Sequence, residues 1–209
     1  LLTFFTSSSA LSRWRAERKR AATGEMAKDE RRDLAQTLAN GGVAAALVVV
    51  GRLRPATPWL PALVGALATV NADTWATEVG LLSRRPPRLI LTGRVVEPGL
   101  SGGVTPLGLG AAGCGAALIG AVAALGTPPR DWRWVALATS AGLAGSLVDS
   151  LLGATVQARY RCPVCGVNTE RRWHRCGAAT ERVGGWRWME NDAVNFASSL
   201  AGAALGWRW

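Results

Sequence analysis

Six apolar segments divide the chain and constrain its fold more than any other feature of the sequence. A helix needs about 20 residues to cross a bilayer, so five segments are long enough and the first is too short to span alone. Glycine-rich apolar runs with terminal tryptophans are typical of polytopic membrane proteins, and the chain has 25 Gly and 10 Trp. We therefore predict an all-α fold, one membrane domain over residues 1–209 with about six transmembrane helices. The segments cover residues 1–14, 34–53, 59–82, 105–126, 132–152 and 190–209.

The positive charge is distributed unevenly among the connecting loops. The loops at about 13–32, 83–104 and 153–189 carry 19 of the 24 Lys and Arg residues. By the positive-inside rule these three loops are cytoplasmic, which predicts a multi-pass integral membrane protein. Membrane topology explains the net charge of +10 better than nucleic-acid binding does, so we expect no nucleic-acid partner. The chain opens on Leu inside an apolar run, and we expect a trimmed start.

The motif at residues 71–80, NADTWATEVG, follows the apolar run 59–70 without a break. Ionisable groups at such depth are costly and usually functional, so Asp73 and Glu78 are candidate site residues in the cytoplasmic half of the segment. At 3.6 residues per turn, Asn71 and Glu78 share one stripe, whereas Asp73 and Thr77 share another. The helix is therefore either buried on most of its circumference or broken near the motif.

Polar residues of three further segments fall at the same predicted level. In the fifth segment Ser146 and Asp149 follow helical spacing along one face, and in the sixth Asn191 and Asn195 do the same. Asp192 lies beside them, and the second segment begins with Gln36 and Asn40. Two other interpretations stay open: polar residues commonly gather at helix ends, and the acids could pair with Lys or Arg at the membrane surface.

A glycine-rich stretch, PGLSGGVTPLG at 98–108, precedes the fourth segment. Thr105 is a suitable helix cap and Pro106 suits the first helical position. Such a turn could bind an anion through Ser101, Gly102 and Gly103, or it could simply connect two helices. Acids and amides beside an anion site favour a hard divalent cation, so we expect Mg²⁺ on Asp73, Glu78, Asp149 and Asp192 with a bound nucleotide.

Cysteine and histidine converge in the last basic loop. CxxC at Cys162 and Cys165, followed by His174 and Cys176, has the spacing of a small zinc knuckle. The alternative is three reduced thiols and a solvated histidine. Any metal here would be a structural Zn²⁺, because four protein ligands leave no open position.

Several motifs, in order along nearly the whole chain, carry a family resemblance. They are residues 5–20, RDLAQ at 32–36, ANGG at 39–42, NADTWATEVG at 71–80, PGLSGGVTPLG at 98–108, GSLVDSLLGATVQ at 145–157, HRCG at 174–177 and WMENDAVN at 188–195. The chain resembles the phytyl-phosphate kinase family of vitamin E synthesis, which includes human transmembrane protein 19 and is similar to the CTP-dependent phytol and dolichol kinases. The resemblance implies a CTP-dependent kinase that phosphorylates a prenyl monophosphate.

The predicted site combines these signals. The acids Asp73, Glu78, Asp149 and Asp192 would hold Mg²⁺, and the partners would be membrane lipid, a prenyl phosphate and a nucleotide, with the oligomeric state open. The rival functions are a cytidylyltransferase that forms a CDP-lipid and a membrane transporter. The residues expected to bind substrate or nucleotide are Lys19, Arg32, Gln36, Asn40, Asn71, Thr77, Arg94, Ser101, Gly102, Gly103, Ser146, Asn191 and Asn195.

Overall fold

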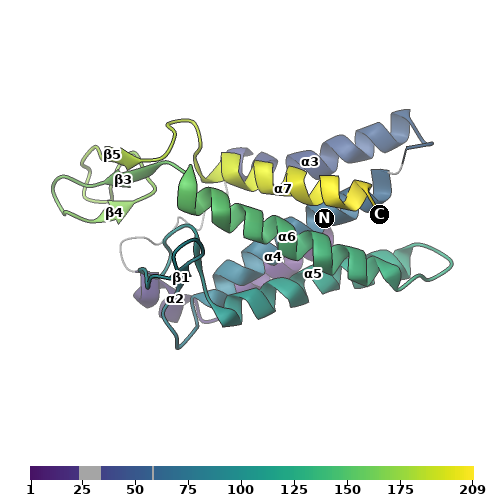
Figure 1. Ribbon diagram of the computed structural model, residues 1–209, viewed down its shortest axis with the longest axis horizontal. Helices are drawn as coiled ribbons and strands as arrows, with labels where there is room; N and C mark the ends of the chain where they lie inside the picture. The colour runs from purple at the N-terminus through teal and green to yellow at the C-terminus, as the bar shows by residue number, and fades with distance from the viewer. Residues whose placement is uncertain (24–33, 58) are drawn as a thin grey trace.

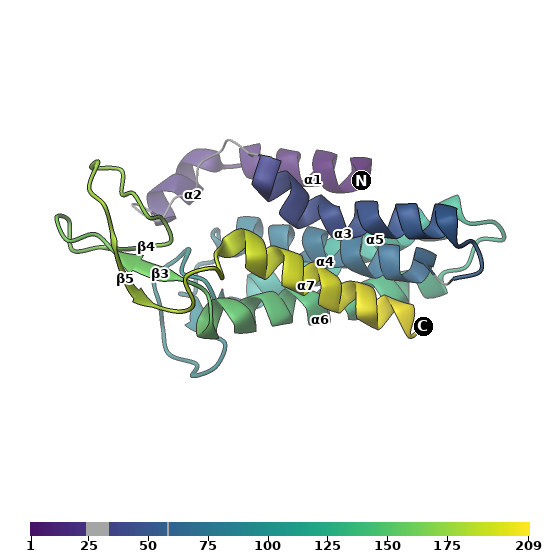
Figure 2. The same ribbon diagram turned by 90° about the horizontal axis from the view of Figure 1, so that it is seen from above.

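A computed structural model describes residues 1–23, 34–57 and 59–209 and has a bundle of long helices (Figures 1 and 2). The helices are α1 (Leu2–Arg13), α2 (Ala16–Thr23), α3 (Leu34–Leu53), α4 (Trp59–Gly80), α5 (Pro106–Gly126), α6 (Arg133–Thr155) and α7 (Asn191–Trp207). Five of the predicted segments coincide with α3 to α7 within about three residues, and the first corresponds to α1. The fold class predicted from the apolar segments is therefore confirmed.

Two short sheets lie between the helices. Strands β1 (Arg88–Leu89) and β2 (Gly103–Val104) pair antiparallel, and β3 (Arg159–Arg161) pairs antiparallel with both β4 (Asn168–Thr169) and β5 (Glu181–Gly184). Figure 1 shows α2, β1 and the β3–β5 sheet at one end of the bundle, which we call the loop end, with the α5–α6 connection at the opposite end. The described residues of the three basic loops thus lie at one end, as the charge pattern predicted.

Helix α4 is the centre of the bundle. It packs against α1, α3, α5, α6 and α7, and it is continuous from Trp59 to Gly80. Of the two alternatives for the 71–80 motif, the structure has the unbroken helix that is surrounded by others. By length and composition, the described residues contain three helical stretches apolar enough to cross a membrane: Gln36–Leu53, Pro106–Gly126 and Arg133–Thr155.

Small residues let α4 approach α6 and α7 closely. Thr69 is fully buried in α4, and its hydroxyl donates to the Gly65 carbonyl at 3.0 Å. A Cβ atom placed on Gly145 would lie 2.2 Å from the Thr69 Oγ1, and one on Gly202 would lie 2.0 Å from it. Both glycines are therefore required by the close contact of three helices at Thr69.

One element differs from prediction. The loop expected at 13–32 contains the helix α2 (Ala16–Thr23). Its sequence, AERKRAAT, is rich in good helix formers, but it has no apolar stripe, so hydropathy alone gave no sign of a helix.

Candidate functional site

A buried asparagine begins the polar half of α4. Asn71 is fully buried. Its side-chain Nδ2 donates to the Gly115 carbonyl of α5 at 2.7 Å, and its Oδ1 accepts from the Ser7 hydroxyl of α1 at 3.0 Å. The indole of Trp75 donates to the same Ser7 hydroxyl at 3.3 Å. Asn71 therefore ties three helices together, since both polar ends of its amide have protein partners.

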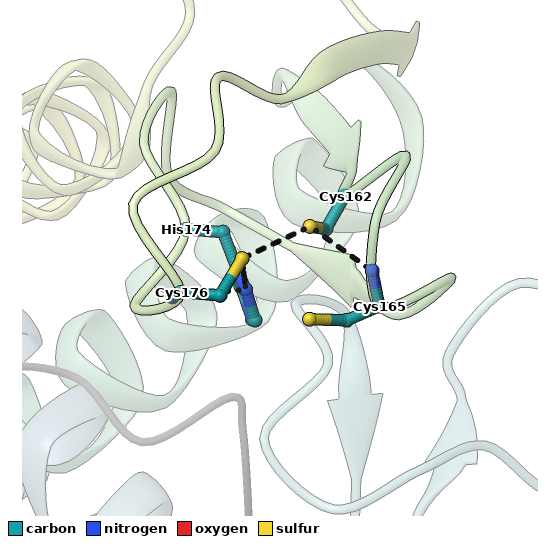
Figure 3. Close-up of side chains that lie close together, drawn as sticks. All are labelled: Cys162, Cys165, His174 and Cys176. Carbon is teal, nitrogen blue, oxygen red and sulfur yellow. Dashed lines mark hydrogen bonds between the residues drawn. The ribbon is translucent and has the colours of Figure 1, made fainter.

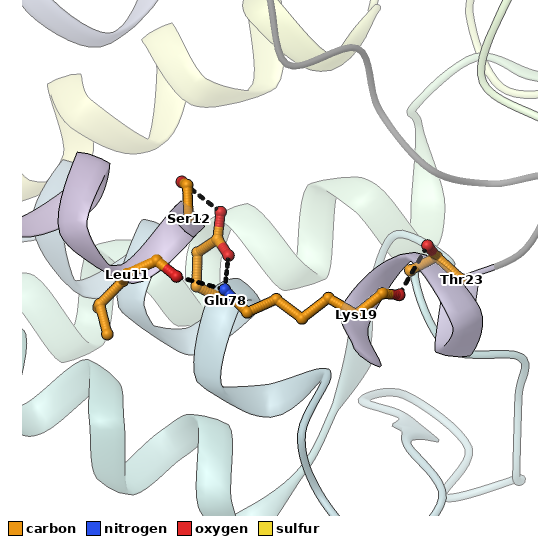
Figure 4. Close-up of polar contacts among 5 residues, drawn as sticks. All are labelled: Leu11, Ser12, Lys19, Thr23 and Glu78. Carbon is orange, nitrogen blue, oxygen red and sulfur yellow. Dashed lines mark hydrogen bonds and ion pairs between the residues drawn. The ribbon is translucent and has the colours of Figure 1, made fainter. Parts of the chain in front are cut away.

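In the last turn of α4, Glu78 forms an ion pair with Lys19 of α2 (Figure 4). Ser12 of α1 donates to the second carboxylate oxygen at 2.6 Å, and the Leu11 carbonyl accepts from the Lys19 ammonium. The Lys19 side chain is only 7% exposed and that of Glu78 is 21% exposed. Burying either charge alone would be costly, so each compensates the other.

This pair changes the interpretation of two predicted site residues. Lys19 was expected to bind substrate and Glu78 to bind Mg²⁺, and the structure brings them into contact with each other. The ion-pairing alternative therefore applies to Glu78, through a cation 59 positions away. Neither Ser7 nor Ser12 was predicted as a site residue, although polar residues in the short apolar segment 1–14 were a usable signal.

The polar faces of α6 and α7 meet at Asp149. Its carboxylate accepts from the Ser198 hydroxyl at 3.0 Å, and that hydroxyl also lies 3.0 Å from the Asn195 carbonyl. Ser146 is buried one turn earlier on α6. Asp149, which the helical spacing placed on the polar face of α6, thus contacts α7 through Ser198.

The glycine-rich turn packs against the end of α6. Gly102 has a φ of +81°, and a Cβ atom there would lie 2.6 Å from the Ala154 Cβ, so only glycine fits. The Ser101 hydroxyl donates to Glu170, which follows β4. The Gly103 N–H donates to the Leu100 carbonyl at 3.1 Å, so this amide is engaged within the turn rather than directed outward.

Helix α5 begins as the sequence predicted. The Thr105 hydroxyl accepts from the Gly108 N–H at 3.0 Å, and Pro106 occupies the first helical turn. The second half of the glycine-rich stretch is therefore fixed by β1–β2 pairing at Gly103 and Val104 and by this cap at Thr105.

The other predicted residues lie around the loop end. Asp192 is in the first turn of α7, where the helix dipole favours a carboxylate. Thr77 and Arg94 are exposed, and Arg32 lies outside the described residues. The half-buried members are Asp73, Gln36, Asn40, Asn191 and Asn195.

The four predicted acids do not form a preformed metal site. Within residues 1–23, 34–57 and 59–209, the only group of three or more Asp, Glu, Cys or His ligands close enough to share an ion is formed by Cys162, Cys165, His174 and Cys176. A magnesium ion on Asp73, Asp149 or Asp192 would need phosphate oxygens or water to complete its coordination, as is usual for this ion.

The Cys and His side chains point toward one another at the far side of the loop end (Figure 3). Their ligand atoms all lie within 4.8 Å of one another. The Cys165 N–H donates to the Cys162 sulfur at 3.4 Å, and this bond lowers the pKa of the Cys162 thiol. A hydrogen bond with Cys176 is the main cause that raises the pKa of Cys165, to about 12.

An open apolar groove of about 920 Å³ runs between α5 and α6 beside α4. It begins near Trp75, whose indole donates to Ser7, and it reaches Trp132 at the start of α6. Ser7 belongs to what we call the polar layer, the polar side chains of the helices near the loop end. An elongated apolar chain would fit the surface of the groove. Its walls include Trp75, Cys114, Leu118, Trp132 and Val135.

Comparison with known proteins gave three results. A family model described as "Integral membrane protein DUF92" matches residues 1–203. "Protein PGR" of Arabidopsis thaliana is 32% identical over 224 residues, which cover 96% of this chain and 76% of that protein. An uncharacterized membrane protein of Methanocaldococcus jannaschii is 37% identical over 158 residues, which cover 74% of this chain and 62% of that protein. No solved structure matches.

Proposed function

This chain belongs to the DUF92 family of integral membrane proteins, as its motifs indicated, and we propose that it is a CTP-dependent kinase that converts a prenyl monophosphate into the diphosphate. The acceptor is of the phytyl or geranylgeranyl type. The reaction takes place at the cytoplasmic face, where the three basic loops gather. The matched family supplies the membrane setting, and the polar residues near the loop end of the helices would supply the chemistry.

The position of the acids along the helices is the observation that carries the proposal. Asp73 and Glu78 lie seven and two residues before the end of α4. Asp149 lies six residues before the end of α6, and Asp192 is the second residue of α7. At 1.5 Å per residue, all four lie within about 10 Å of the loop end. Transporters place such groups near the bilayer midplane, so this arrangement supports chemistry on a ligand at the surface.

The donor set fits Mg²⁺ and a phosphorylated acceptor. Carboxylates and amides are the hard oxygen ligands that this ion prefers, and Mg²⁺ commonly uses only one or two carboxylates beside phosphate oxygens. Bound Mg²⁺ would neutralise the phosphates of the nucleotide. Asp73, Asp149 and Asp192 would hold it from α4, α6 and α7.

The ion pair of Lys19 and Glu78 has a part in the same proposal. A prenyl monophosphate is mostly ionised at pH 7 because its second pKa is near 6, so it requires charge neutralisation rather than a strong base. On binding, the acceptor phosphate would replace Glu78 as the partner of Lys19. The Glu78 carboxylate would then be available to the metal. Arg94, exposed before the glycine-rich turn, would offset charge on the nucleotide.

The apolar groove is suited to the prenyl tail. It is lined almost entirely by apolar atoms and opens toward the outer surface of the bundle between α5 and α6. A tail in the groove would leave its phosphate near Trp75 and the polar layer, with Ser7 and Asn71 behind it.

Turnover by the purified protein in detergent tests the proposal. With CTP, Mg²⁺ and phytyl or geranylgeranyl monophosphate, we expect CDP and the prenyl diphosphate, measured by mass spectrometry. Release of inorganic diphosphate with a CDP-lipid would identify the rival cytidylyltransferase instead. Absence of turnover with all four common nucleoside triphosphates and both acceptors would refute the kinase.

A matched pair of acid-to-amide variants locates the chemistry. Asp73→Asn should lower turnover at least 100-fold with an unchanged melting temperature, because a metal ligand is lost without a change of shape. Asp131→Asn makes the same chemical change in the α5–α6 connection at the opposite end and should keep wild-type turnover. Equal rates in the two variants would remove Asp73 from the site.

A further inference from the structure

Residues 159–184, which we call the Cys/His module, contain two turns that each end in a glycine directly after a cysteine. In the first, Gly166 follows Cys165, and in the second, Gly177 follows Cys176. Both glycines have a left-handed φ, +71° and +84°. The chain reverses at each turn, with the Gly166 N–H donating to the Cys162 carbonyl and the Gly177 N–H to the His174 carbonyl, both at 2.9 Å. Two turns of this form direct four side chains toward one point.

Two distances among the four ligand atoms are close to the edges of a tetrahedral zinc site, and all four atoms lie within 4.8 Å of one another. The sulfurs of Cys162 and Cys176 are 3.6 Å apart, and Cys176 lies 3.1 Å from the His174 Nδ1. A tetrahedron with Zn–S bonds of about 2.3 Å has sulfur–sulfur edges of about 3.7 Å. The Cys165 N–H donates to the Cys162 sulfur at 3.4 Å. Hydrogen bonds from backbone groups around a metal site orient its ligands in this way.

We propose that Cys162, Cys165, His174 and Cys176 bind one structural Zn²⁺. Three thiolates and one imidazole are soft ligands in a closed set of four, which selects Zn²⁺ and leaves no position for a substrate. The site is separate from the proposed magnesium site, and its existence does not depend on the kinase activity.

The module has too little apolar core to hold its shape without a metal. Only four of its side chains are buried, and two of these are the ligands Cys162 and His174. Tyr160 is the one large side chain that is buried, whereas Val164, Trp173 and Val183 are exposed. Segments of this size generally need a disulfide or a metal for stability, and the cysteines here are unbridged.

The same module is attached to the proposed active face at two points. Glu170, between the two turns, accepts from Ser101 of the glycine-rich turn. Arg172 forms an ion pair at 2.5 Å with Glu190, the residue before α7. Zinc would therefore also fix the glycine-rich turn through Glu170.

Metal analysis of the purified wild-type protein is the first test. Elemental mass spectrometry of the dialysed protein should find about one zinc ion per chain. Cys162→Ser and Cys176→Ser should each lower the zinc content at least fivefold. Cys114→Ser, the same change in α5 outside the module, should retain it. Zinc no higher in the wild type than in Cys162→Ser, or iron in place of zinc, would overturn the proposal.

A second measurement remains informative if the serine variants fail to fold. Removal of zinc from the wild-type protein by a chelator should speed hydrogen exchange in residues 159–184 and also in residues 97–104. In Glu170→Gln, zinc should stay bound while exchange in 97–104 alone becomes faster. Unchanged exchange after complete metal removal, or a disulfide between module cysteines in the native protein, would contradict a structural zinc.

Discussion

The two halves of α4 contact their neighbours in different ways. Residues 59–70 meet α6 and α7 through backbone and small side chains, with glycines at 145 and 202 against Thr69. Residues 71–80 meet α1, α2 and α5 through hydrogen bonds and an ion pair. The first half is fixed by shape, whereas the second adds polar contacts to the close approach of Gly108 and Gly115 on α5. A site that binds charged ligands requires the second kind of contact.

Gly202→Ala should have the largest effect on stability. The new Cβ would lie 2.0 Å from the Thr69 hydroxyl and 2.7 Å from the Gly65 carbonyl, so the helices must separate. We expect a loss of about 3 kcal/mol, the upper part of the range for overpacking, measured by thermal or denaturant unfolding in detergent.

Two controls sharpen this prediction. Gly110→Ala changes a helical glycine with open space around it and should be neutral or slightly stabilising. Thr69→Ala combined with Gly202→Ala should recover part of the lost stability. An unaltered melting temperature in Gly202→Ala alone would show that the first half of α4 is not fixed by shape.

Lys19→Met tests the polar half and should cost about 2 kcal/mol. It leaves the Glu78 carboxylate mostly buried without its cation, which is the costly way to break such a pair. The double variant Lys19→Met, Glu78→Gln should regain most of that loss, because no unpaired charge remains. A double-mutant cycle in unfolding experiments measures the coupling, and additive effects would show that the two side chains do not interact.

Asn71→Ala should have the smallest of the three effects, about 1–2 kcal/mol. It removes two hydrogen bonds and leaves the buried Gly115 carbonyl without its partner. Ser7→Ala, which removes one of these bonds, should cost less. The turnover of Asn71→Ala sharpens the comparison. If its turnover falls far more than that of an equally destabilised variant, Asn71 takes part in substrate binding. If the two turnovers fall equally, Asn71 only connects helices.

The sequence predicted the helices well because their signal is local. Each of α3 to α7 is an apolar run bounded by charged, glycine or proline residues, and the cap at Thr105 follows from its own side chain. The contact of Asp149 with α7 was also accessible, since residues three and four apart share a helix face. The spacing alone also predicted that Cys162, Cys165, His174 and Cys176 lie close together, within a stretch of 15 residues.

The remainder depends on contacts between distant parts of the chain. Nothing near Glu78 in sequence indicates that Lys19 pairs with it, because the partner comes from α2, a helix without an apolar stripe. Likewise, no local pattern links Ser101 with Glu170, which lie 69 positions apart. Acids at helix ends thus indicated where the polar layer is, while the identity of each partner required the structure.

The packing at Thr69 has a consequence for how relatives of this protein can diverge. The hydroxyl of Thr69, the two facing glycines and Gly65 occupy one shared volume. A larger residue at position 202 is therefore tolerable only with a smaller one at 69, and the same holds between 145 and 69. These positions should covary across relatives, with alanine at 69 wherever either glycine has been replaced, because serine would keep the oxygen that clashes.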